Sequence, residues 1–188
     1  QDRIRDHLLT PILAVPASMY PQGRMQSVVL KGIDPGQTIL AIPSSSLVVD
    51  IPEIPAIIGT RMAKSNKLHT GDLVTVRWRD AHGTFDAAEV KIVAVMRTTV
   101  AGVDQGKIWL PLERLQRMTQ LAGQASFLVA RPDYSPATSQ AGWIAKEQEV
   151  LLEPIAALIK AKSFGAAIIF TLLLLLAMLA VLMFQMLR

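Results

Sequence analysis

The longest apolar stretch of the chain lies near its C-terminal end, at residues 163–187. It runs about 25 residues without a charge, and its only clearly polar members are Ser163, Thr171 and Gln185. A helix needs about 20 apolar residues to cross the hydrocarbon core of a bilayer. The leucines at 172–176 would occupy every side of that helix, which leaves no polar stripe of the kind that a soluble helix keeps. The pattern predicts a transmembrane helix over 163–188.

An amphipathic segment at residues 143–162 leads into this run. Its apolar side chains recur at helical spacing, at Ile144, Leu151, Ile155, Leu158 and Ile159. Pro154 removes one backbone hydrogen bond and can kink the helix. The spacing predicts an amphipathic stalk helix over 143–162. Together with the apolar run it would form a rod of about 65 Å at 1.5 Å per residue.

Residues 1–142 contain several short segments with the period-two alternation of strands. The clearest is LVTVRW at 73–78, in which Val74, Val76 and Trp78 share one face. Further strands are predicted at 12–15, 25–31, 47–49, 88–97, 107–110 and 125–131. Clusters of Gly, Pro and Asp predict turns at 32–36, 69–72 and 80–83.

Two helices are predicted between these strands. Residues 56–68 fit a helix with Ile57 and Ile58 on its inner side. Residues 111–121 fit a second helix with Pro111 in its first turn, where a missing N–H costs nothing.

The remaining segments are predicted to be connections. Prolines and small residues place loops at 16–24 and 37–55 and a linker at 132–142. Residues 1–9 have the spacing of the end of a short amphipathic helix. The predicted fold is therefore mixed α+β: a core domain over 1–142, followed by the stalk helix and the transmembrane helix.

Charge and cysteine content narrow the function classes. The chain carries 19 Lys and Arg against 15 Asp and Glu, but the basic residues are dispersed and few aromatic residues lie among them. Nucleic acid is therefore not an expected partner. The absence of cysteine excludes disulfides, thiolate catalysis and cysteine-bound zinc. It also fits an extracytoplasmic domain of a bacterial protein.

No motif for catalysis or cofactor binding is found in the chain. Gly102 and Gly106-Lys107 resemble a phosphate-binding loop, but three residues instead of four separate the glycines, and Ile108 follows the lysine. The histidines lack metal-ligand spacing: His7, His69 and His82. We therefore name no catalytic, cofactor-binding or metal-binding residue, and we expect no enzyme activity and no cofactor.

Some single residues have a structural and a functional interpretation. Three aspartates beside turns are expected to accept hydrogen bonds from nearby backbone N–H groups: Asp34, Asp72 and Asp104. Methionine adapts to varied binding partners. Even so, the residues that flank the first proline-rich loop are interpreted as ordinary core: Met19, Tyr20 and Met25.

Four segments together resemble the extracytoplasmic domain of FtsX-like ABC transporter permeases. They are VVLKGIDP (28–35), IIGTRMAKSNKLHTGDLVTV (57–76), KIWLPLERLQRM (107–118) and the stalk that runs from Trp143 into the apolar run. Their order and spacing are similar to those of the family, which includes MacB-like efflux permeases. The resemblance is greatest to the lipoprotein-releasing Lol-type permeases.

The resemblance implies a permease subunit that has no catalysis of its own. It would lie in the bacterial inner membrane with its MacB-like core domain in the periplasm. An ATPase on a separate cytoplasmic chain would move that domain through the stalk, a mode of action called mechanotransmission. The work would be lipoprotein release or export of another amphiphile. The chain would then be a fragment, with one membrane span before Gln1 and more after Arg188.

The expected partners follow from the same resemblance. They are the cytoplasmic ABC ATPase, a second permease chain in a homo- or heterodimer, membrane lipid, and a lipoprotein or a periplasmic carrier. Carrier-binding Lol-type permeases have an extended hairpin, called the hook, after the Gly-Asp turn. Here the corresponding connection at residues 79–87 is short, which argues against carrier binding of that type.

Two other classes of function stay open. The first is a single-pass, membrane-anchored extracytoplasmic binding or adaptor module, and the second is a membrane-anchored enzyme. The charges that flank the apolar run do not decide its orientation, because Arg188 lies at one end and Lys160 and Lys162 at the other.

Overall fold

The computed structural model describes residues 8–98 and 104–134 and, in the C-terminal run, residues 171, 173, 174, 176–178, 183, 185 and 186. These residues belong to two compact units, Gln1–Ser135 and Pro136–Arg188. Among the described residues no helix is long and apolar enough to cross a membrane. The stalk helix at 143–162 lies outside the described residues, and the transmembrane helix at 163–188 is described only in part. Both therefore stay predictions.

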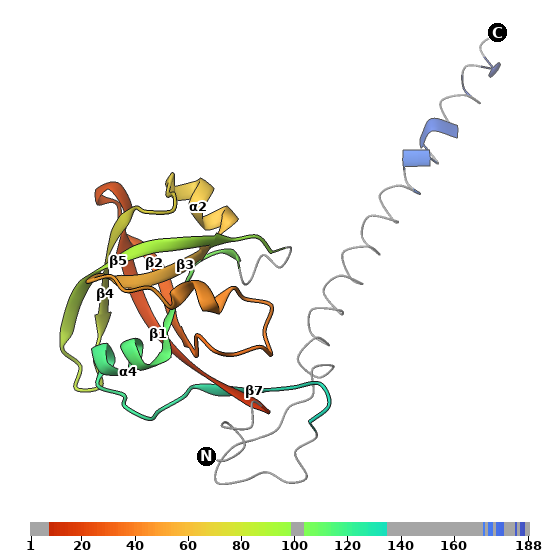
Figure 1. Cartoon of the computed structure of the whole chain (residues 1–188). Coiled ribbons are helices and arrows are strands. Elements are labelled where there is room, and N and C mark those ends of the chain that lie inside the picture. The colour runs from red at the N-terminus through yellow and green to blue at the C-terminus, as the bar shows by residue number, and fades with distance from the viewer. Residues whose placement is uncertain are drawn as a thin grey trace. The chain divides into compact units, whose positions relative to one another are not determined.

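The first unit contains a seven-stranded sheet in the order β2-β6-β3-β5-β4-β1-β7 (Figure 1). The strands are β1 (Leu9–Tyr20), β2 (Gln26–Ile33), β3 (Ile54–Gly59), β4 (Leu73–Arg79), β5 (Phe85–Met96), β6 (Lys107–Pro111) and β7 (Phe127–Ala130). Its helices are α2 (Thr60–Asn66), α4 (Leu112–Thr119) and the 3-10 helices η1 (Pro21–Gly23) and η2 (Ser44–Leu47). The β2–β6 and β3–β5 pairs are parallel and the others antiparallel, so the fold is mixed, as predicted.

Strand β1 closes this sheet on itself, because it pairs with β2 as well as with β4. Residues 12–19 of β1 pair with β2 along one edge. The other edge pairs with β7 at residues 9–12 and then with β4 at residues 17–20. Pro16 has no N–H to donate, and it falls in the gap between these two partners. The loop predicted at 16–24 is therefore wrong in its first half, which continues β1 to Tyr20.

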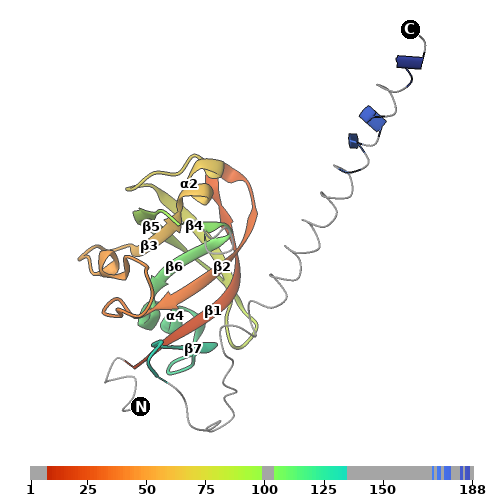
Figure 2. The ribbon, with the colours of Figure 1, turned by 90° about the vertical axis from the view of Figure 1, so that its right-hand side faces the viewer.

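The main core fills the inside of the closed sheet. In β4 the residues Val74, Val76 and Trp78 are buried and those between them are exposed, which confirms the predicted alternation. The two helices close the ends of the sheet (Figures 1 and 2): Met62 of α2 joins the core at one end, and Leu115 of α4 joins it at the other.

A second apolar cluster lies on the outer face of the sheet, around Ile57 and Trp109. The segment 34–53 covers it and inserts Leu47 of η2. This segment is held together by its own buried polar groups. The side-chain Nε2 of Gln37 donates to the carbonyl of Leu40 and to Ser44 Oγ, both at 3.1 Å. Ser44 Oγ in turn donates to the carbonyl of Pro35 at 3.1 Å.

The helix predicted at 56–68 is wrong over its first part, because Ile54–Gly59 form β3 and only Thr60–Asn66 are helical. The side chains of Ile57 and Ile58 are both buried, but on opposite faces of the sheet. Because a short apolar run fits a buried strand and a buried helix equally well, periodicity alone could not decide. The helix predicted at 111–121 is confirmed as α4, but Pro111 ends β6 and is the N-cap residue and not part of the first turn.

The strand predicted at 47–49 is also wrong. Leu47 ends the 3-10 helix η2, and the side chains of Val48 and Val49 are 72% and 43% exposed. The other predicted strands are confirmed, most of them with longer bounds in the structure. Of the helix predicted at 1–9, residues 1–7 lie outside the described residues and Leu9 belongs to β1. The predicted linker at 132–142 is described only up to residue 134.

Two adjacent serines, Ser44 and Ser45, test whether the buried hydrogen bonds of Gln37 and Ser44 stabilise the segment 34–53. Ser44→Ala should lower the free energy of unfolding by about 1–2 kcal/mol, because it leaves buried partners of the hydroxyl unsatisfied. Ser45→Ala is the matched control: its side chain is exposed, and the change should stay within about 0.5 kcal/mol. Urea unfolding of the chain in non-ionic detergent, followed by tryptophan fluorescence, measures both. Equal effects of the two changes would show that the buried hydrogen bonds of Ser44 do not stabilise the segment.

Candidate functional site

No catalytic constellation is found in the described residues. Among them no group of three or more His, Cys, Asp or Glu could hold a metal ion. His69 Nδ1 lies 3.7 Å from Asp72 Oδ2, and the His82 amide donates to Asp80 Oδ1 at 2.9 Å. His7 lies outside the described residues. The candidate functional features are therefore a helix junction, the pairing of β1 with β7, and an exposed groove.

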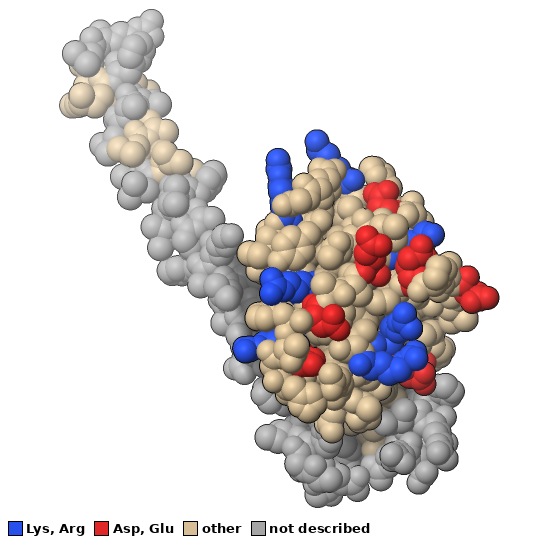
Figure 3. Space-filling view, turned by 90° about the vertical axis from the view of Figure 1, so that its left-hand side faces the viewer, with Lys and Arg blue, Asp and Glu red and all other residues tan. Residues whose placement is uncertain are grey.

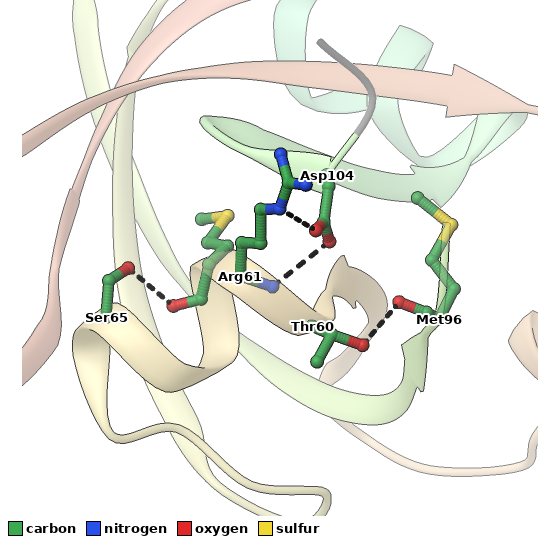
Figure 4. Close-up of polar contacts among 6 residues, drawn as sticks. Thr60, Arg61, Ser65, Met96 and Asp104 are labelled. Carbon is green, nitrogen blue, oxygen red and sulfur yellow. Dashed lines mark hydrogen bonds and ion pairs between the residues drawn. The ribbon is translucent and has the colours of Figure 1, made fainter. Parts of the chain in front are cut away.

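The aspartates at turns have structural roles. Asp34 accepts a hydrogen bond from the amide of Gly36 at 2.9 Å, and Asp72 accepts one from His69 at 2.8 Å, as predicted. Asp104 differs, because its partner is not a neighbour in the sequence. Its carboxylate accepts the amide of Arg61 at 3.1 Å, at the start of α2 (Figure 4). The sequence did not predict this long-range contact.

Asp104 caps helix α2 in place of the usual N-cap side chain. The N-cap residue is Gly59, which has no side chain to offer. The Asp104 carboxylate is 1% exposed and also lies 3.4 Å from Arg61 Nε. A Cβ on Gly59 would lie only 2.1 Å from Asp104 Oδ1, so glycine makes the close approach possible. The neighbouring Thr60 hydroxyl donates to the carbonyl of Met96 at 3.0 Å, which ties α2 to the end of β5 (Figure 4).

The points where the chain enters and leaves the domain lie side by side. Leu9 of β1 pairs with Ala130 of β7, and the amide of Arg131 donates to the carbonyl of Leu8 at 3.1 Å. Ser126 directly precedes β7, and its Oγ accepts a hydrogen bond from the amide of Ala14 at 2.9 Å. The β1–β7 ladder thus joins the two flanking segments at one end of the closed sheet.

An open groove of about 420 Å³ lies on the outer face of β1 and β4. It is lined mainly by Pro16, Ser18, Tyr20, Met25, Arg77, Arg79 and Phe85. Phe85 and Met25 are 60% and 68% exposed, unusual for large apolar side chains. Figure 3 shows the face of the molecule that carries β4, on which basic and acidic side chains are interspersed.

Two arginines stack on the exposed ring of Phe85 in this groove. The guanidinium carbons of Arg77 and Arg79 lie 4.3 and 5.4 Å from its centroid. Arg79 is paired with Phe85 across the strands, and its Nε donates to the carbonyl of Gly83 at 2.7 Å. Neither arginine has an acidic partner among the described residues. Stacked guanidinium groups keep their N–H edges free for carboxylates or phosphates, so the groove suits a partner with apolar and anionic groups.

The sequence interpretation missed this groove. Met19 is fully buried, as predicted, but Met25 is exposed at the groove and is not core. Arg77 stood on the outer side of a predicted strand, but Phe85 was placed in the connection at 79–87, whereas in the structure it begins β5. An aromatic residue on the polar side of a hairpin, opposite an arginine, is the signal that could have identified them.

A lysine of β2 has an unusual environment. Lys31 Nζ lies 5.0 Å from the ring centroid of Trp109 and 5.2 Å from that of Phe127. Burial lowers the pKa of Lys31 below its ordinary value of 10.5, and the positive charge of Lys107 lowers it further. The aromatic rings stabilise the charge only in part.

Comparisons with known proteins give similarities in structure only. No family model and no curated protein matches the chain. The extracellular domain of the noncanonic ABC-type transporter YknZ from Gram-positive bacteria is similar, with 12% identity, a TM-score of 0.46, and coverage of 72% of this chain and 73% of that one. A domain assigned to a permease protein from Porphyromonas gingivalis has 13% identity and a TM-score of 0.43, over 69% of this chain and 58% of that one. At TM-scores below 0.5 these likenesses do not extend to function.

Glycine substitutions test the junction between α2 and Asp104. Gly59→Ala should lower the free energy of unfolding by about 2–3 kcal/mol, because the new methyl group would collide with the Asp104 carboxylate and backbone. Gly36→Ala is the control, since its Cβ would lie 3.5 Å from the nearest atom, an ordinary contact. Chemical unfolding of the two variants gives the comparison. A Gly59→Ala variant as stable as the control would show that the junction is not tightly packed.

A charge substitution tests the environment of Lys31. Lys107→Gln should raise the pKa of Lys31 toward 10.5, because it removes a nearby positive charge. Lys91→Gln, which removes the partner of Glu53, should leave that pKa unchanged. NMR titration of the chain with ¹³C-methylated lysines measures both. An unchanged Lys31 pKa in Lys107→Gln would disprove the electrostatic coupling.

Proposed function

We propose that the chain is the extracytoplasmic domain, stalk and second membrane helix of a permease subunit of an ABC transporter. The domain lies on the periplasmic side of a bacterial inner membrane. A cytoplasmic ATPase on a separate chain drives it, and a second permease chain completes the transporter. The subunit works by mechanotransmission, so that the domain moves and the substrate does not pass through this chain.

The observation that carries the proposal is the β1–β7 ladder. It joins the incoming segment at Leu8 to the outgoing segment at Arg131 by backbone hydrogen bonds. Force from two flanking helices would therefore reach the domain at one rigid point. From there β1 transmits it directly, since this strand pairs with β2, β4 and β7. A domain that only bound a ligand would not need both connections at the same place, although nearby termini are common in domains generally.

The groove on β1 and β4 is the proposed contact for the cargo. Its exposed Phe85 and Met25 suit acyl chains or apolar side chains, and its arginines suit an anionic group. An amphiphile such as a lipoprotein has both. Strands β4 and β5 are joined only by residues 80–84, which leaves no room for an extended hook. The cargo would therefore meet the sheet face and not a protruding hairpin.

A membrane-anchored binding module is the second candidate, and the same groove favours it. Such a module needs an exposed apolar and cationic surface but no ATPase. Purification from native membranes in mild detergent separates the two candidates. We expect an ABC ATPase to copurify in constant ratio with the protein that contains this chain, and its absence would favour the binding module.

Spin labels test the coupling in the intact transporter. The 188 residues contain no cysteine, so Ser45→Cys on the exposed part of segment 34–53 gives a specific labelling site once any cysteines in the rest of the transporter have been replaced. The distance between labels on the two permease chains should change when ATP binds. A flexible Gly-Ser-Gly insertion after Arg131 should reduce that change while ATP hydrolysis continues, because force from the stalk no longer reaches β7.

The matched control is the same insertion in the exposed turn at His82. This turn is not on the path from the membrane to the sheet, so the nucleotide-dependent distance change should persist. A distance that never responds to nucleotide, or that responds equally with both insertions, would rule out mechanotransmission through the ladder.

A further inference from the structure

Helix α2 carries an unbalanced row of positive charge. Arg61, Lys64 and Lys67 follow one another at a spacing of three, and all are exposed. No acidic residue lies in the sequence between Glu53 and Asp72. Arg61 pairs with Asp104, but Lys64 and Lys67 have no acidic partner among the described residues. Lys64 lies in the last turn of α2 and Lys67 is its C-cap, where positive charge complements the helix dipole and remains accessible from outside the fold.

A polar notch lies beside the end of this row. Its volume is about 80 Å³, and it separates η1 from the C-terminal end of α2. It is lined by Pro21, Gln22, Arg24, Ser65, Asn66 and Lys67. A water needs roughly 10–15 Å³, so the notch has room for a carboxylate group and a few waters but not for a large ligand.

The side chains of the notch are suited to an anion. Arg24, like Lys67, is exposed and has no acidic partner among the described residues. Gln22 and Lys67 have φ values of 51° and 54°, in the left-handed region that favours glycine. For Lys67 this is the conformation of the C-cap of α2, and Gln120 has the same conformation at the C-cap of α4.

We propose that this notch binds a carboxylate of an acidic segment in a partner protein. The guanidinium of Arg24 would hold the carboxylate by two parallel hydrogen bonds, and Lys67 would add a point charge. Ser65 Oγ and Asn66 Nδ2 both donate to the carbonyl of Met62, and Asn66 Nδ2 also donates to Ser65 Oγ. Asn66 Oδ1 and one lone pair of Ser65 Oγ therefore remain as acceptors for a bridging water. Lys64 extends the attraction along α2 to further acidic residues of the same segment.

The position of the notch favours a protein over a lipid headgroup. The chain enters the domain at Leu9, the first residue of β1. The notch lies at the other end of this strand, where η1 follows Tyr20. Eleven residue steps of strand place these two ends about 35 Å apart. If the proposed function is right, the bilayer lies beyond Leu8. Its distance from the notch is then several times the Debye length, roughly 8 Å at physiological salt, over which charges interact. Figure 1 shows α2 at the end of the domain away from α4, and Figure 3 shows basic side chains projecting at that end.

A labelled peptide tests the proposal on the whole chain in uncharged detergent. The probe is a fluorescein-labelled peptide of alternating Ser and Glu, and fluorescence anisotropy measures its affinity. Arg24→Gln/Lys67→Gln should weaken binding at least about fivefold, because both charges face the ligand. Arg24→Glu/Lys67→Glu should abolish it and should instead bind a peptide of alternating Ser and Lys. Thermal unfolding should be unchanged, since neither side chain has an acidic partner among the described residues.

The control removes the same charge at the other end of the domain. Arg114→Gln/Arg117→Gln on α4 should leave the affinity unchanged. An equal loss in this control would mean attraction by net charge and would overturn the proposal.

Binding of inorganic phosphate at the notch without binding of the peptide would overturn it in favour of a free anion. Binding of phosphatidylglycerol vesicles that depends on Arg24 and Lys67 would overturn it in favour of lipid. Failure to copurify an ATPase would leave the peptide result unaffected, so the two proposals fail separately.

Discussion

The fold depends on the hydrogen bonding of both edges of one strand. β1 pairs with β2 along one edge and with β7 and β4 along the other. This double pairing turns an open sheet into a closed one, so that six strands share a single apolar interior. Closure also removes the unpaired edges that make open sheets prone to association. Pro16 is compatible with it only because the proline falls between the segments paired with β7 and β4.

The short helices depend on that sheet and not on their own sequences. α2 has seven residues, no acidic residue in its first turn and a glycine at its N-cap. An isolated helix of this length is not stable in water. It forms because Met62 packs into the core and because the buried carboxylate of Asp104 accepts the amide of Arg61. A contact between distant parts of the chain therefore replaces the local signals that usually start a helix.

The features relevant to function are distributed along β1. At its beginning, the ladder with β7 joins the segments that enter and leave the domain. On its outer face, with β4, lies the groove in which Arg77 and Arg79 lie against the ring of Phe85. At its end, after Tyr20, lies the basic notch beside α2. A strand that is paired on both sides is stiff, so a displacement at the first point would move the other two with it. This arrangement suits a domain that transmits force from a membrane to a partner.

The sequence by itself determined the elements with strong local patterns. The alternation at 73–78 and the amphipathic face of 111–121 gave β4 and α4, because neighbouring residues alone fix which side is apolar. The tertiary structure decided the rest. Residues 56–59 form a strand because β5 and β6 bond both of its edges. β1 continues through Pro16 because its partners leave a gap there. Asp104 meets Arg61 because the fold brings residues 43 positions apart together, and no local pattern records such a meeting. Arg77 meets Phe85 across the β4–β5 hairpin, and the pairing register of that hairpin decides the contact.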